Sequence, residues 1–180
     1  MQYEYQLDEI DLLTFQLFTV SKNKRMTRRR WRSGILTGLG SIVLAFFSKN
    51  NGLETLFYYW LIFGVLILFL YPFYVKNVWK RHYKRHVIEN HSERMGLLST
   101  LEFTDKQILT SSSFMQSQID LNQLKLIIEI KDYLFLQLKY GDTLVIPQAK
   151  IKELDHLKKQ LETLSDQLDI GYIKELDWKW

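Results

Sequence analysis

Two histidines four residues apart are the first side chains in this chain whose spacing suggests chemistry. His82 and His86 would share one face of a helix, where two imidazoles can bind a metal ion. The residues between them, Tyr83, Lys84 and Arg85, bring two positive charges and no carboxylate, so this face would repel a cation. We therefore expect structural or interfacial histidines, and neither a metal site nor a cofactor.

A run of hydroxyl groups is the second candidate. Ser111, Ser112 and Ser113 lie together, but a serine becomes a nucleophile only when a base activates it, and no histidine or acid is placed to do so here. The chain has no cysteine, which excludes disulfides, thiolate catalysis and zinc–cysteine sites. It also has no glycine-rich phosphate loop. The sequence therefore predicts a protein that is not an enzyme.

Basic residues form two clusters that flank an apolar block, residues 34–75, whose only charged residues are Lys49 and Glu54. Beside a membrane each such residue attracts anionic lipid by ~1 kcal/mol, but the same residues also fix the orientation of membrane spans. We favour the second interpretation and keep lipid binding as the alternative. Nucleic-acid binding is not expected, because no base-reading or stacking module accompanies the charge. The flanking residues are Lys22, Lys24, Arg25, Arg28, Arg29, Arg30, Arg32, Lys76, Lys80, Arg81, Lys84 and Arg85.

The charge of the chain is divided unevenly between its two halves. Residues 1–96 have a net charge of +7, and residues 97–180 have a net charge of −3. The positive excess therefore belongs to the part that flanks the apolar block, and the candidate folded domain is acidic. The first residues lack a basic stretch followed by an apolar run, so we expect no signal peptide and expect the first apolar segment to direct insertion.

The apolar block predicts a transmembrane hairpin over residues 31–76, with spans at about 31–48 and 55–75. The second span is an uncharged run of 21 residues, which as a helix covers ~31 Å, about the thickness of a hydrocarbon core. A core helix of a soluble protein rarely runs this long without charge. The first span is shorter, and its alternative is a re-entrant or interfacial segment. Gly34 and Gly38 would nevertheless allow close helix packing.

The connection Lys49–Gly52 is so short that the two spans must be antiparallel. It carries one basic residue, against twelve on the other side of the spans. The positive-inside rule therefore predicts a multi-pass protein of the plasma membrane with both chain ends in the cytoplasm.

The flanks of the hairpin are expected to fold in the cytoplasm. In residues 1–30, Tyr3 and Tyr5 alternate with polar residues, which predicts a short half-buried strand. Asp8 then offers an N-cap for an amphipathic basic helix that runs toward the first span. Beyond the second span, residues 77–96 continue the helix as a basic extension that ends at Gly96.

Residues 97–169 predict an antiparallel meander followed by a helix. Short runs with a period of two are separated by tight turns, among them the serine run, and Pro147 ends the strands. A single apolar stripe then recurs at helical spacing, which favours a helix that covers the sheet over one that forms a coiled coil. Residues 170–180 are a tail whose Trp178 and Trp180 either enter the membrane interface or pack on the domain. The stripe consists of Ile151, Leu154, Leu157, Leu161, Leu164 and Leu168.

The order of these segments resembles the YcxB-like family of bacterial membrane proteins. The resemblance implies a PH-like cytoplasmic domain, a small bent sheet or partial barrel closed by the C-terminal helix, and it brings no enzymatic activity. Such proteins often have a tryptophan where this chain has Leu121. The residues that carry the resemblance are Leu101–Thr104, Asp120–Leu124, Ile127–Leu136 and Val145–Pro147.

The expected fold is therefore an α+β membrane protein, and the expected function is a membrane-tethered, non-catalytic binding or regulatory module. Its expected partners are membrane lipid, a protein bound to the cytoplasmic domain, and further copies of the chain bound through the hairpin. Two alternatives stay open. One is a small oligomeric transport or pore component, although ionisable groups are scarce in the spans, and the other is protection against membrane-active toxins or envelope stress.

Overall fold

A computed structural model describes residues 2–91, 95–112 and 116–180, and within them the chain is an α+β protein with four helices and two four-stranded sheets. The chain divides into two compact units. The first unit comprises Met1–Phe15 together with Val87–Trp180, and the second comprises Gln16–His86. The first residues of the chain thus belong to the same unit as the C-terminal half, although the sequence analysis treats them separately.

The first sheet of the first unit joins the N-terminal strand to three strands that follow the helical hairpin. All pairs are antiparallel, in the order β1-β2-β3-β4. Tyr3 and Tyr5 of β1 are buried and their neighbours exposed, which confirms the predicted half-buried strand. The strands are β1 (Gln2–Gln6), β2 (Leu98–Phe103), β3 (Gln107–Ser112) and β4 (Gln116–Asp120).

The second sheet contains a strand that the sequence analysis did not predict. Its order is β7-β6-β5-β8, and β8, which lies in the predicted tail, pairs in parallel with β5. The strands are β5 (Leu124–Ile130), β6 (Tyr133–Leu138), β7 (Thr143–Pro147) and β8 (Gly171–Glu175). Two short 3-10 turns, η2 (Leu121–Gln123) and η3 (Gln148–Lys150), precede β5 and follow β7.

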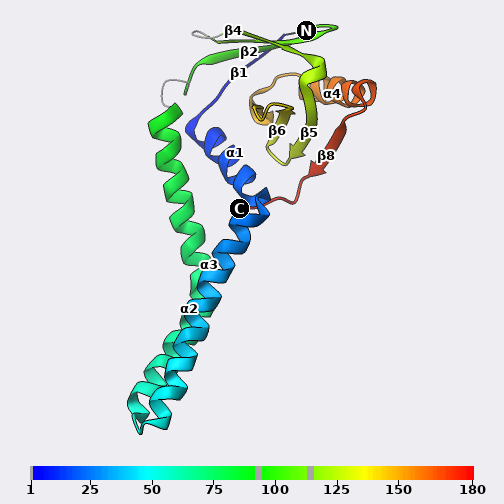
Figure 1. Ribbon diagram of the computed structural model, residues 1–180. Coiled ribbons are helices and arrows are strands. Elements are labelled where there is room, and N and C mark those ends of the chain that lie inside the picture. The colour runs from blue at the N-terminus through cyan, green and yellow to red at the C-terminus, as the bar shows by residue number, and fades with distance from the viewer. Residues whose placement is uncertain (1, 92–94, 113–115) are drawn as a thin grey trace. The chain divides into compact units, whose positions relative to one another are not determined.

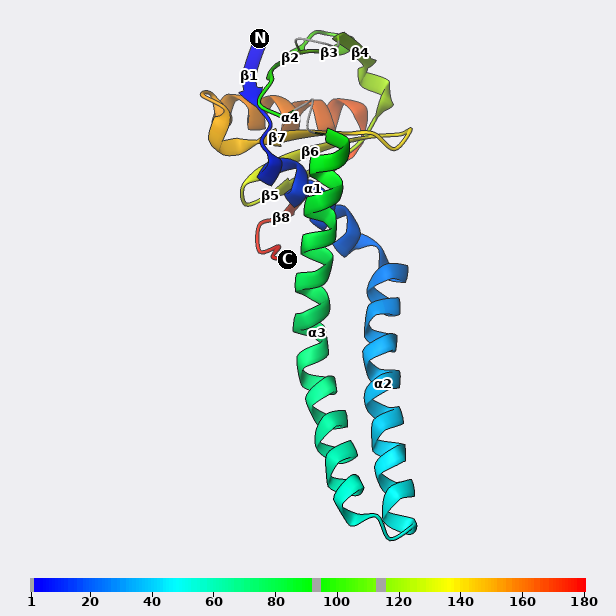
Figure 2. The same cartoon turned by 90° about the vertical axis from the view of Figure 1, so that its left-hand side faces the viewer.

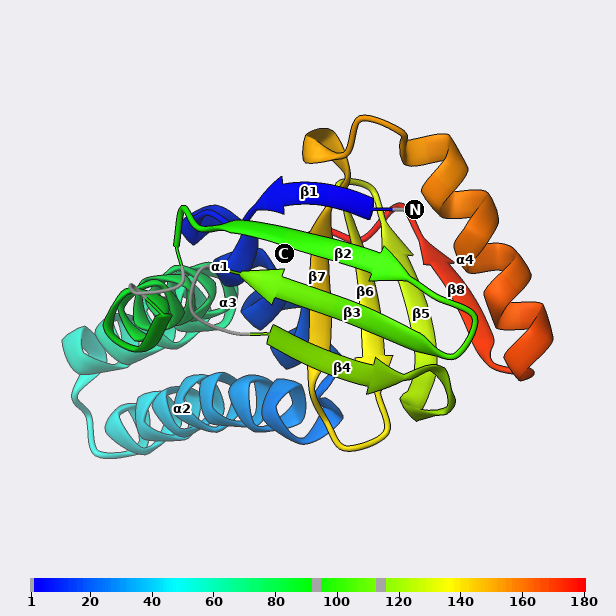
Figure 3. The same cartoon turned by 90° about the horizontal axis from the view of Figure 1, so that it is seen from above.

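The helix α4 (Leu154–Leu168) completes the core of the first unit. Leu157, Leu161 and Leu164 of its predicted apolar stripe are buried. They share one hydrophobic cluster with residues of both sheets, such as Leu101 and Ile127. Figure 3 shows the two sheets stacked with their strands crossing steeply, and α4 running along one side. The prediction of a helix that covers a sheet is therefore confirmed.

The described strands form two separate sheets and not one closed barrel. The reason lies in β5, whose two edges pair with β6 and with β8 and which therefore has no free edge for β4. The predicted serine turn was also wrong in part. Ser111 and Ser112 continue β3 and pair with β2, while Ser113 lies outside the described residues.

Three helices separate β1 from β2 along the chain: α1 (Glu9–Lys22), α2 (Lys24–Asn50) and α3 (Glu54–His91). α1 begins where predicted, because the backbone N–H of Asp8 donates to Asp11 Oδ2 at 2.8 Å. It does not run on into α2, because Asn23 interrupts the helix and accepts a hydrogen bond from the Arg25 backbone at 3.1 Å. α3 extends the second apolar segment well beyond residue 75, as predicted.

In the second unit, α2 and α3 form an antiparallel hairpin, and they lie side by side in both Figure 1 and Figure 2. Gly52, at a φ of 73°, provides the left-handed turn that connects them. A Cβ placed on Gly38 would lie 2.6 Å from the side chain of Leu68, and one on Gly34 would clash with Tyr71. These glycines therefore allow the close approach that the sequence predicts.

Candidate functional site

The surface of the hairpin is the first candidate site, because it exposes apolar side chains along its length. Within the part of the chain that is described, the helix Glu54–Glu89 is the one long and apolar enough to cross a membrane, with a mean hydropathy of 2.0 in its most apolar window. α2 does not meet this measure. Length and composition would also fit the core helix of a soluble protein, but only 6% of the α3 window is buried.

Exposed tyrosines lie toward both ends of the apolar part of α3, whereas exposed phenylalanines such as Phe63 and Phe69 lie between them. Tyr58 and Tyr59 are exposed near the hairpin turn, and Phe73 and Tyr74 are exposed near the basic extension. The two groups are ~22 Å apart along the helix at its usual rise per residue. Tyrosine and tryptophan favour the boundary between lipid and water, so this spacing suits the two interfaces of a thin hydrocarbon layer.

The predicted basic residues lie on the helices of the second unit. On α2 the described ones, Arg25, Arg28 and Arg32, are exposed, whereas the side chains of Lys24, Arg29 and Arg30 lie outside the description. Lys22 ends α1, where its Nζ lies 5.3 Å from the centre of the Phe18 ring. On α3, Lys76 is half-buried and the remaining four are exposed; these are Lys80, Arg81, Lys84 and Arg85.

The two histidines lie on α3 as predicted, and both are exposed. The ring of His82 contacts Tyr83 edge to face, with 5.6 Å between the ring centres. The described residues contain no group of three or more histidine, cysteine, aspartate or glutamate side chains that could hold a metal ion.

A buried carboxylate connects the start of α1 to the second sheet. Asp11 is 5% exposed; its Oδ1 accepts from the Tyr133 hydroxyl at 2.9 Å, and its Oδ2 pairs with Lys150 at 2.7 Å. Lys150 also pairs with Asp8 at 2.6 Å. Every partner of Asp11 in this set is a donor, so the network stabilises the entry of the chain into α1.

The contacts with Asp11 change the pKa values of Tyr133 and Lys150. Burial, followed by the hydrogen bond to Asp11, raises the pKa of Tyr133 to about 12. Burial alone would lower the pKa of Lys150, but the hydrogen bonds and charges of Asp11 and Asp8 outweigh burial and raise it. The tyrosine is therefore held protonated, and the lysine charged.

A second buried carboxylate connects β5 to α4 and β8. Glu129, also 5% exposed, accepts from Lys158 at 2.7 Å and from the Tyr172 hydroxyl at 2.9 Å. Burial, followed by the contact with Glu129, raises the pKa of Tyr172. Both carboxylates accept from donors inside the fold on each of their oxygens, and these contacts connect neighbouring elements.

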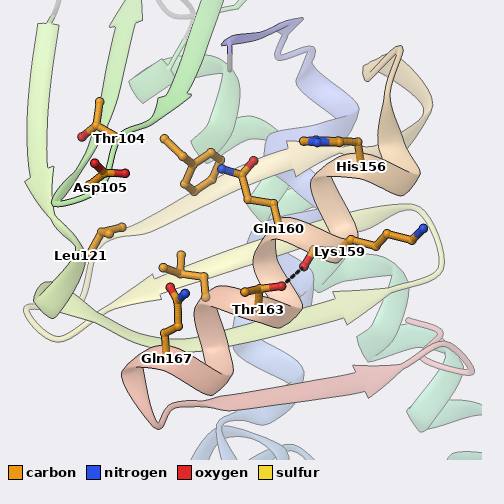
Figure 4. Close-up of a pocket in the computed structure, with 10 residues that line it drawn as sticks. Thr104, Asp105, Leu121, His156, Lys159, Gln160, Thr163 and Gln167 are labelled. Atoms are coloured by element: carbon orange, nitrogen blue, oxygen red, sulfur yellow. Dashed lines mark hydrogen bonds between the residues drawn. The ribbon is translucent and has the colours of Figure 1, made fainter.

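A groove of about 700 Å³ lies between α4 and the turn that connects β2 to β3. Figure 4 shows Thr104, Asp105 and Leu121 on one side and the side chains of α4 on the other, with Lys159 extending away from the rest. Its lining residues are Phe103, Thr104, Asp105, Leu121, His156, Lys159, Gln160, Thr163, Leu164 and Gln167.

Several polar groups in and beside this groove have hydrogen-bond partners inside the fold. The hydroxyl of Thr163 donates to the Lys159 carbonyl at 3.0 Å, and that of Thr104 donates to the Gln107 carbonyl at 2.8 Å. The hydroxyl of Tyr3 lies 2.9 Å from His156 Nδ1 and 3.0 Å from Gln160 Oε1. The threonine protons are thus engaged by backbone carbonyls, whereas the Tyr3 hydroxyl lies within hydrogen-bond distance of an imidazole nitrogen.

The sequence contains no local signal for this groove. Its lining residues come from segments around positions 103, 121 and 160, which only the folded unit brings together. No spacing within any one of these segments marks a site.

Comparisons with protein-family models, curated proteins and solved structures found no match.

Proposed function

We propose that this chain is an integral membrane protein in which α2 and α3 cross the plasma membrane as a hairpin. The first unit is then a non-catalytic binding module on the cytoplasmic side. The observation that carries the proposal is the exposure of α3, which combines a mean hydropathy of 2.0 with only 6% of that window buried. Apolar surface left in water costs about 25 cal/mol per Å², so a helix of this composition needs lipid or protein around it.

The pairing of β1 with β2 supports a second crossing. The pairs run from Gln2–Glu102 to Gln6–Leu98. The segment between the two strands must therefore begin and end on the same side of any membrane. If α3 crosses, another segment must cross in the opposite direction. α1 has 14 residues, short of the ~20 that a span requires, which leaves α2 for the return.

The flanking charges support the orientation. Arg32 precedes the apolar part of α2 and Lys76 follows that of α3, and both belong to a set of twelve basic residues against Lys49 alone in the turn. Such an excess favours the cytoplasmic side. The groove on α4 and the resemblance to the YcxB-like family both support a binding role for the first unit, the latter as an analogy of fold.

Single cysteines test the arrangement, because the chain has none of its own. Asn51→Cys places a thiol in the hairpin turn, and Tyr140→Cys places one on an 86% exposed side chain of the first unit. We expect a membrane-impermeant maleimide to label the first variant in intact cells and the second only after permeabilisation. The unmodified chain is the blank. Protection of Asn51→Cys, or labelling of Tyr140→Cys from outside, would contradict the proposal.

A further inference from the structure

The second unit carries a large excess of positive charge. Residues 16–86 contain thirteen lysines and arginines and a single acidic residue, Glu54. Glu54 begins α3 beside the hairpin turn, at the opposite end of the helices from twelve of these basic residues. Glu54 can therefore pair with very few of these residues, and Glu89 is the next acidic residue along α3.

The two helices hold these charges at the same end of the hairpin. The contact of Gly34 with Tyr71 sets the register of α2 against α3. Arg32 lies just before that contact in α2, and Lys76 lies just after it in α3. The basic ends of both helices therefore lie beside each other where the apolar surface stops.

The helical rise sets the height of each charge above the apolar surface. At ~1.5 Å per residue, Lys80 stands ~8 Å and Arg85 ~15 Å beyond Val75 along α3. The headgroup layer is about 5–7 Å thick on each side, and screening at physiological salt extends the reach of its charge by ~8 Å. The exposed charges of α3 therefore lie just beyond the headgroup layer, where the charge of the lipid phosphates still reaches them.

The basic residues of α3 occupy two neighbouring faces of the helix. Lys76, Lys80 and Lys84 recur at four-residue steps on one face, and Arg81 and Arg85 occupy the neighbouring face. Arginine forms bidentate hydrogen bonds with phosphate, and lysine acts as a point charge. A topological signal needs only the number of basic residues near a span, whereas this arrangement presents fixed charges to a ring of surrounding headgroups.

We propose that these residues form a collar that binds anionic phospholipid headgroups and enriches them around the hairpin. The collar consists of Arg25, Arg28, Arg32, Lys76, Lys80, Arg81, Lys84 and Arg85. This inference rests on the proposed function, since the collar meets headgroups only if the hairpin lies in a bilayer.

The test is the lipid preference of the full-length chain in vesicles of phosphatidylcholine and phosphatidylglycerol, measured with spin-labelled forms of both lipids. We expect the chain to prefer phosphatidylglycerol, by roughly fivefold for each basic contact made. The preference should fall as the screening length shortens from ~30 Å at 0.01 M salt to ~3 Å at 1 M. Phosphate and chloride of equal ionic strength should reduce it equally; a selective loss in phosphate would indicate a site for soluble phosphate and overturn the proposal.

Two variants with the same change in net charge separate the collar from general electrostatics. The collar variant is K80Q/R81Q/K84Q/R85Q, and the control is K106Q/K125Q/K139Q/K152Q, whose four lysines are exposed on the first unit. We expect the collar variant to lose most of the preference and the control to keep it. Equal preferences in the wild-type chain and the collar variant would overturn the proposal, as would no preference in the wild type.

An alkaline wash and flotation of the vesicles precede the measurement. A chain that washes off would refute the membrane proposal and the collar with it. A chain that stays bound without a lipid preference would refute the collar alone.

Discussion

Asp11 is the residue on which the start of α1 depends most. Its carboxylate is buried and takes hydrogen bonds from three elements: the Asp8 backbone, Tyr133 on β6 and Lys150 on η3. A buried carboxylate without donors would be costly, whereas with all of them it stabilises one arrangement of these elements. The sequence marks Asp11 only as an acid in the first turn of a helix, and its partners more than 120 residues away are not visible there.

We expect Asp11→Ala to lower the free energy of unfolding by about 2–4 kcal/mol, because it leaves Tyr133 and Lys150 without their acceptor. Asp8→Ala is the matched control, because Asp8 pairs with the same lysine but its side chain is 60% exposed, and we expect a loss below about 1 kcal/mol. Denaturant unfolding of the full chain in detergent measures both. Equal losses in the two variants would contradict this account of the network.

The raised pKa of Tyr133 predicts a loss of stability in alkali. The pKa is about 12 in the folded chain against 10.0 for an ordinary tyrosine. The folded state therefore holds this proton more tightly, and the stabilisation is complete below pH ~10 and disappears as the pH rises toward ~12. The pKa of Lys150 is raised as well, so the ion pair weakens in the same direction.

We expect Tyr133→Phe to be less stable than the wild-type chain at neutral pH and to lose less stability as the pH rises above ~10. Other buried tyrosines, such as Tyr5 with a pKa of about 12, should keep some alkaline dependence in the variant. Unfolding measured from neutral pH to pH ~12 checks this. Parallel curves for the two chains would show that Tyr133 does not carry the effect.

At the scale of elements, the hairpin depends on close packing between α2 and α3. Gly38 and Gly64 lie against each other, since a Cβ on Gly64 would be 3.0 Å from the Gly38 carbonyl oxygen. Gly40 lies only two residues farther along α2, and a Cβ there would meet nothing within 4 Å. α2 thus carries one glycine that close packing requires, Gly38, and one that it does not require, Gly40.

We expect Gly38→Val to separate the helices and to destabilise the hairpin by about 1–3 kcal/mol, the usual cost of overpacking. Gly40→Val makes the same chemical change on the open face and should leave the separation unchanged. The distance between spin labels on α2 and α3 measures the effect in detergent or vesicles. An equal displacement by both substitutions would mean that the glycine contact does not hold the hairpin together.

The elements that the sequence predicts are those with strong local patterns. The apolar stripe that ends at Leu168 identifies α4, and the alternation around Tyr3 identifies β1. β8 was missed because its five residues have little alternation and its partner, β5, lies about 45 positions earlier in the chain. The serine run predicts a turn because serine favours turns, but pairing with β2 makes Ser111 and Ser112 part of a strand. The groove depends on that same long-range assembly, so no local pattern could reveal it.

At the scale of the whole molecule, the chain inserts a helical hairpin between two paired strands of one folded unit. β1 precedes the hairpin and β2 follows it, and they pair along five residues. This connectivity links the fold of the first unit to the membrane topology proposed for the second, because paired strands cannot lie on opposite sides of a bilayer. The sequence predicts the hairpin and its charges but not this link, because β1 and β2 are separated by more than 90 residues.

Extraction of cell membranes with alkaline carbonate tests most directly whether the hairpin lies in lipid. Carbonate releases proteins held at the membrane by charge, whereas a hairpin buried in hydrocarbon stays with the lipid. We predict that the full-length chain stays in the membrane pellet and floats with the vesicles in a density gradient. Release of the chain into the carbonate supernatant, or a soluble chain without detergent, would contradict the account.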